Sequence, residues 1–166
     1  ISVSPNGEYL AYSISDGGSD WRTWKVLEID TEKTTDDLIE WSKFSYATWE
    51  SDSSGFYYQK YNKPEEALSD INRSPQLFFH KLGDKQEDDV LIYEDRQNPD
   101  YSWSISVPEK GSYRILSIGE GTDERNFLSI SLDKDLNFIP LIDEFKATYR
   151  FLSLIHISEP TRRLII

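Results

Sequence analysis

The chain has 166 residues, 14% of them aromatic, a formal net charge of −12 and no cysteine. This acidic balance excludes a nucleic-acid backbone or an anionic membrane as the expected partner, since both bind basic surfaces, and no apolar run approaches membrane-spanning length. Without cysteine, neither disulfides nor thiol chemistry arise. An acidic globular domain with an aromatic core is therefore expected.

The first predicted unit covers residues 1–42. It opens with the turn sequence Ser-Pro-Asn-Gly at residues 4–7, in which proline presets φ and Asn-Gly tolerates left-handed backbone. Residues 1–3 before the turn are expected to end a first strand, and an apolar strand at residues 8–15 follows the turn. A third strand at 23–29 alternates apolar and charged side chains. A short outer strand at 37–40 completes an antiparallel unit of four strands.

The turn followed by an aromatic strand returns twice, at residues 50–58 and 107–116. We align the turn glycines Gly7, Gly55 and Gly111, which recur at a spacing of about 50 residues. In an all-β chain this period is typical of the stacked blades of a β-propeller. The strands expected in the second and third units are 44–49, 56–61, 76–82, 89–93, 102–107, 112–118, 126–132 and 138–142.

The predicted fold is therefore all-β, with about three four-stranded antiparallel blades of a β-propeller. The blades are expected at about residues 1–42, 43–100 and 101–146, and residues 147–151 would begin the next one. Two short segments, 36–43 and 64–71, are the only candidates for helix. The first of them overlaps the outer strand expected at 37–40.

The character of the chain changes at Leu152. Residues 152–162 (Leu-Ser-Leu-Ile-His-Ile-Ser-Glu-Pro-Thr-Arg) resemble the in-frame translation of a sequencing adapter, so 152–166 is expected to be a non-native tail. The alternative is a native apolar strand with a polar end. Because Ile1 already lies in a strand-like segment, we expect an internal fragment of a longer protein. Any signal peptide would lie outside it, and a cytoplasmic or a periplasmic location fits.

No catalytic residue, metal site or cofactor is predicted. The chain has no Gly-x-Ser-x-Gly sequence, which would mark a serine nucleophile. His80 is the single histidine before the tail and lies in the strand expected at 76–82. Strand alternation is expected to turn it to the surface or to a hydrogen bond, as a structural residue. One histidine without cysteine does not supply the ligands of a zinc site.

Several stretches resemble the propeller of the prolyl oligopeptidase family, in the same order along about residues 2–151. Loop residues 67–69 (Ala-Leu-Ser) are most similar to bacterial members, and Gly-Ser-Asp-Trp speaks against the sister family of oligopeptidase B. The second and third turns depart from the family pattern, with Ser-Gly and Lys-Gly in place of Asp-Gly. The stretches that carry the resemblance are 18–21 (Gly-Ser-Asp-Trp), 43–49 (Lys-Phe-Ser-Tyr-Ala-Thr-Trp), 55–58 (Gly-Phe-Tyr-Tyr), 76–83 (Gln-Leu-Phe-Phe-His-Lys-Leu-Gly) and 118–126 (Ile-Gly-Glu-Gly-Thr-Asp-Glu-Arg-Asn).

The resemblance implies a serine endopeptidase that cleaves short peptides after proline, with an α/β-hydrolase domain capped by a seven-bladed propeller. This chain would be a non-catalytic part of that cap, which admits short proline-containing peptides and works with a hydrolase domain in cis. In the family an aromatic residue on the second blade strand lines an apolar substrate subsite, and the matching position is Tyr57. Core packing is the other explanation for Tyr57. The alternative function is a stand-alone β-propeller binding module without a hydrolase domain.

Overall fold

The computed structural model describes residues 1–63, 73–108, 113–132 and 136–152. The helix candidate at 64–71 and all of the expected tail beyond Leu152 lie outside these residues. Within the described part of the chain, no helix has the length and apolar character needed to span a bilayer.

The described residues form twelve β-strands and one short 3₁₀ turn, η1, which confirms the all-β prediction. Neighbouring strands within each run of four pair antiparallel. The elements are β1 (Ser2–Val3), β2 (Tyr9–Ile14), β3 (Arg22–Glu28), β4 (Lys33–Ser42), β5 (Thr48–Trp49), β6 (Gly55–Lys60), β7 (Gln76–Lys81), η1 (Gln86–Asp88), β8 (Val90–Glu94), β9 (Tyr101–Ser106), β10 (Arg114–Glu120), β11 (Asn126–Ser131) and β12 (Ile139–Ile142).

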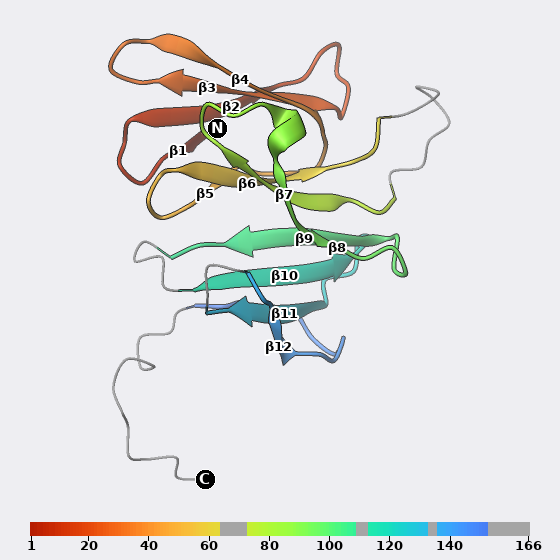
Figure 1. Cartoon of the computed structure of the whole chain (residues 1–166). Coiled ribbons are helices and arrows are strands. Elements are labelled where there is room, and N and C mark those ends of the chain that lie inside the picture. The colour runs from red at the N-terminus through yellow and green to blue at the C-terminus, as the bar shows by residue number, and fades with distance from the viewer. Residues whose placement is uncertain (64–72, 109–112, 133–135, 153–166) are drawn as a thin grey trace, which may run out of the picture.

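We call β1–β4, β5–β8 and β9–β12 the first, second and third groups. The first two groups belong to one sheet, in which a single bridge between Ser42 and Lys60 joins β4 to β6. The third group is a separate sheet, in the order β12-β11-β10-β9. In Figure 1 the first group lies above β6 and β7, and the third group lies below them.

Strand β6 is buried on both of its faces. A strand directs alternate side chains to opposite sides, so consecutive residues of β6 enter different cores. Phe56 and Tyr58 enter the core between the first and second groups, beside Trp24, Ile39 and Trp49. The intervening Tyr57 enters the core between the second and third groups, and other members of that core are Leu77, Trp103, Ile105, Leu116 and Ile118. Strand β6 is therefore the central element of the stack.

The helix candidate at 36–43 is wrong, because residues 36–42 belong to β4, a strand of ten residues. Its burial follows a period of two, with Asp37 and Ile39 buried and Leu38 and Glu40 exposed. Such alternation suits a strand with one covered face and not a helix. No strand is assigned within 147–151, where the next unit was expected to begin.

The alignment of Gly7 with Gly55 is also wrong. In the first turn, the Gly7 N–H donates to Ser4 O, and in the second turn the equivalent donor is the N–H of Ser53, to Glu50 O, each at 2.9 Å. Ser53 accordingly has the left-handed φ of 61° that glycine provides in the first turn. Gly55 is instead the first residue of β6. The third turn, at 109–112, lies outside the described residues.

Candidate functional site

A cleft of about 660 Å³ lies between the second and third groups. Its walls come from the segment before β5 and from strands β6, β9 and β10. The lining combines aromatic rings, such as Tyr46, Tyr57 and Tyr101, with hydroxyl groups such as those of Ser104 and Ser117. Tyr46 is 82% exposed. The cleft therefore offers aromatic faces and hydrogen-bonding groups, and it contains the residue predicted to line a substrate subsite.

Tyr57 is one of the lining residues, with only 3% of its surface exposed. Its ring packs on Phe79 at 4.9 Å between centroids. Its hydroxyl donates to Glu50 Oε2 at 2.8 Å. Burial, together with this bond to a carboxylate, raises the pKa of Tyr57, so the phenol is a neutral donor.

Glu50 also receives the guanidinium of Arg114 in a two-point contact. Arg114 Nη2 lies 2.7 Å from Oε1 and Nε lies 3.1 Å from Oε2, with both side chains 9% exposed. Burial acts to raise the pKa of Glu50, but the hydrogen bonds from Arg114, Ser51 and Tyr57 outweigh it and hold the pKa below its ordinary value. This buried ion pair joins the turn before β6 to β10. The sequence analysis did not predict this ion pair. A possible signal was that Glu50 and Arg114 carry opposite charges and lie next to, or within, apolar strands.

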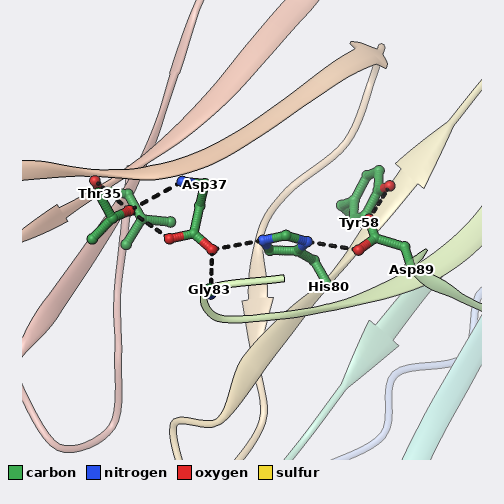
Figure 2. A network of polar contacts seen from close by, with 7 residues as sticks. Thr35, Asp37, Tyr58, His80, Gly83 and Asp89 are labelled. Carbon is green, nitrogen blue, oxygen red and sulfur yellow. Dashed lines mark hydrogen bonds and ion pairs between the residues drawn. The ribbon is translucent and has the colours of Figure 1, made fainter. Parts of the chain in front are cut away.

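His80 lies in a second polar network, drawn in Figure 2. The ring is fully buried, with Nε2 at 2.9 Å from Asp37 Oδ1 and Nδ1 at 2.7 Å from Asp89 Oδ1. Tyr58 donates its hydroxyl to Asp89 Oδ2 at 2.6 Å, and the Gly83 N–H donates to Asp37 Oδ1 at 2.7 Å. The expected hydrogen bond of His80 is confirmed, and its alternative placement at the surface is wrong.

The His80 network is built for holding elements together. Each ring nitrogen faces a carboxylate oxygen, so neither is available to take a proton from a hydroxyl nucleophile, as the base of a catalytic triad does. Within the described residues, no group of three or more His, Asp or Glu side chains is arranged to hold a metal ion. Sequence reasoning missed Asp37 and Asp89 as the partners of His80.

Comparison with known proteins identifies relatives of one kind. The family model described as the prolyl oligopeptidase N-terminal β-propeller domain matches residues 1–154. The prolyl endopeptidase of Elizabethkingia miricola is 35% identical over 149 residues, which are 89% of this chain and 21% of the relative. The dual function macrocyclase-peptidase of Amanita bisporigera is 30% identical over 168 residues, covering 90% of this chain and 23% of the relative.

Comparison with solved structures finds the same kind of protein. The solved structure of prolyl oligopeptidase B from Galerina marginata, bound to a 35mer hydrolysis and macrocyclization substrate, aligns with a TM-score of 0.81 and 28% identity. The alignment covers 90% of this chain and 23% of that one. The chain spans about a fifth of the length of the curated relatives it matches.

Proposed function

The chain belongs to the prolyl oligopeptidase family, as part of its N-terminal β-propeller domain, and we propose that it forms a non-catalytic section of the cap of a peptidase that cleaves short peptides after proline. The observation that carries the proposal is the match of the propeller domain over residues 1–154, joined with a fold alignment that covers nearly all of the chain. The rest of the peptidase would be the remaining blades of the propeller and an α/β-hydrolase domain in the same polypeptide.

Each group of four strands is one blade in this proposal. Blades at about 1–42, 43–100 and 101–146 are supported by the antiparallel order within each group and by the apolar cores that lie between successive groups. The single bridge between Ser42 and Lys60 then becomes a contact between two adjacent blades. A ring of such blades encloses a central passage.

The cap would act as a size filter. A narrow passage admits a short, flexible peptide and excludes a folded protein, so the wall needs shape and packing and no reactive side chain. The doubly buried β6 and the polar networks on its two sides are suited to such a wall. The expected partners are short proline-containing peptides and the hydrolase domain in cis.

The test begins with the gene that encodes this chain, read on through its downstream sequence. The proposal predicts further blade repeats, then Gly-x-Ser-x-Gly and, after it, the acid and histidine of a triad. The purified product should hydrolyse a fluorogenic peptide with proline before the scissile bond. It should leave a serine-for-proline control peptide and a folded proline-containing protein uncut. Blade repeats followed by a stop codon, with no hydrolysis, would identify the alternative, a stand-alone binding propeller.

Tyr57 as a substrate-lining residue stays a prediction. Its place in the cleft supports it, whereas its 3% exposure and its bond to Glu50 support core packing. The variant Tyr57→Leu in the peptidase separates the two roles. A substrate role predicts that Tyr57→Leu raises KM for peptides with a bulky apolar group before proline and leaves KM for glycine analogues unchanged. A packing role predicts lower stability with equal effects on both peptides.

A further inference from the structure

The buried side chain of His80 connects the first and second groups through its two ring nitrogens. Asp37 comes from β4 of the first group, and Asp89 lies between η1 and β8 of the second group. The side chains of His80, Asp37 and Asp89 are 0%, 3% and 1% exposed. Both contacts are therefore shielded from bulk solvent.

The protonation state of the ring follows from this geometry. A neutral imidazole carries one N–H and one bare nitrogen, so one nitrogen lone pair would point at a carboxylate oxygen at 2.7 or 2.9 Å. Only the imidazolium, with two N–H groups, donates to both carboxylates. Two charge-assisted hydrogen bonds then replace one bond and one repulsive contact.

We propose that His80 is held as an imidazolium at neutral pH and forms an alkali-sensitive clamp between the first and second groups of strands. The clamp is closed while the ring carries both protons and opens when one is lost. It is separate from the proposed peptidase function, because it acts on the connection between strand groups and needs no substrate.

The groups that face the ring favour the charged form. They are Asp37 from β4, Asp89 from the segment before β8 and, through Asp89, the phenol of Tyr58 from β6. Burial acts to lower the pKa of His80, but the hydrogen bonds and charges of the two carboxylates outweigh it and raise the pKa to about 9. The phenol stays neutral, because burial and the bond to Asp89 raise the pKa of Tyr58.

Both carboxylates accept further hydrogen bonds. The Gly83 N–H donates to Asp37 Oδ1, the oxygen that also faces His80, whereas the hydroxyls of Thr35 and Tyr58 donate to the other oxygens, Asp37 Oδ2 and Asp89 Oδ2. These donors spread the second negative charge of the Asp–His–Asp arrangement and leave the ring centred between its partners (Figure 2). A second link between the groups runs from Gln86 to the main chain of Glu40, with bonds of 2.9 and 3.0 Å. Loss of the His80 proton therefore breaks the link through the imidazole and leaves the Gly83–Asp37 bond, the Gln86–Glu40 bonds and the Ser42–Lys60 bridge.

The test is ¹⁵N NMR of histidine ring nitrogens in the full chain between pH 6 and pH 10. His156, the other histidine, is replaced in a His156→Gln background so that one ring remains. The expected spectrum has two similar, protonated nitrogens at pH 7.5, with a transition centred near pH 9. A spectrum with one protonated and one bare nitrogen at pH 7.5, or a midpoint near 6.5, would overturn the proposal.

Two further variants tie the transition to the clamp. Asp89→Asn removes one carboxylate and should move the His80 midpoint toward neutral pH by about one unit or more. Asp88→Asn is the matched control, because it makes the same charge change at the adjacent, exposed residue and should leave the midpoint in place. Equal midpoints in Asp89→Asn and the parent chain would contradict the clamp. Equal shifts in both variants would assign the raised pKa to overall charge and contradict it as well.

Discussion

Gln59 on β6 accepts the main-chain N–H of Trp103 on β9 through its side-chain Oε1, at 2.9 Å. The two strands belong to separate sheets, so a side chain makes the link that main-chain pairing makes elsewhere. Gln59 is 2% exposed, and its Nε2 donates to the Tyr61 hydroxyl at 3.3 Å. The amide oxygen thus links the third group to the second, and the bond from the amide nitrogen lies within the second group's own segment.

The first prediction concerns this link. Gln59→Leu replaces the amide with an apolar side chain of similar size and leaves the Trp103 N–H buried without its acceptor. The free energy of unfolding should therefore fall by about 1–3 kcal/mol. Urea unfolding followed by tryptophan fluorescence measures it. The control is Gln97→Leu at an exposed position, which should stay within about 0.5 kcal/mol of the parent. Similar values for both variants would show that the link contributes nothing.

A second prediction follows from the close approach of β6 to β7. A Cβ atom added at Gly55 would overlap the carbonyl oxygen of His80 and lie 2.9 Å from the Cα of Lys81. Gly55→Ala should therefore destabilise the chain by about 1–3 kcal/mol or more, since backbone must move. Gly119→Ala, also in a strand, meets only Ser102 Oγ at 3.7 Å and should be tolerated. The same unfolding experiment compares the two variants, and equal stability would refute this reading of Gly55.

The third prediction concerns the ion pair of Glu50 and Arg114. Arg114→Met leaves the Glu50 carboxylate buried without its cation, which should cost about 3–5 kcal/mol. The double variant Glu50→Gln/Arg114→Met removes the unpaired charge and should recover part of that loss. Arg73→Met breaks an ion pair with Asp100 in which both side chains are more than half exposed, and should cost about 1 kcal/mol or less. A loss for Arg114→Met as small as for Arg73→Met would contradict this assignment.

The fourth prediction is the pH dependence of stability. The pKa of His80 is raised from 6.5 to about 9 in the folded chain, so its contribution is complete below pH 6.5 and is lost as the pH rises through 9. That loss should reach about 3 kcal/mol over this window. His80→Gln should be less stable at pH 6 and should lose much less stability between pH 6.5 and 9. Urea midpoints across the window measure both, and parallel curves for the two chains would contradict the linkage.

Asp37 contributes to the pH dependence of stability at acid pH. Burial acts to raise its pKa, but hydrogen bonds from His80, Thr35 and Gly83 hold it below the ordinary value. Its contribution is therefore present above about pH 4 and is lost as the pH falls through the folded pKa. Asp37→Asn should remove that acid-side loss while lowering stability at neutral pH, as the same urea midpoints at pH 3–6 would reveal.

Much of the fold was predictable because the signals are local. Turn residues and a period of two place most strands within a residue or two, since each pattern depends on neighbours in the sequence. The strand β4 was ambiguous because its polar residues, Asp37 among them, obscure the apolar alternation. Gly55 was misaligned because a serine at position 53 takes the left-handed conformation that glycine was expected to supply.

The polar networks were not predictable for a different reason. His80 meets Asp37 across 43 residues and Arg114 meets Glu50 across 64, so each contact depends on how separate strands stack. Alternation placed His80 on one side of its strand but did not say what covers that side. The burial of Tyr57 depends in the same way on the third group, which covers it.

The contiguity of each four-stranded group has a consequence for how the protein is made. Because every strand pairs mainly with its neighbours in the sequence, β1–β4 have all their hairpin partners as soon as they leave the ribosome. The Asp37 carboxylate remains in water until β7 has been synthesised and delivers His80, about 40 residues later. The direction of translation thus orders the assembly, with local hairpins first and the charged links between groups added as each new group arrives.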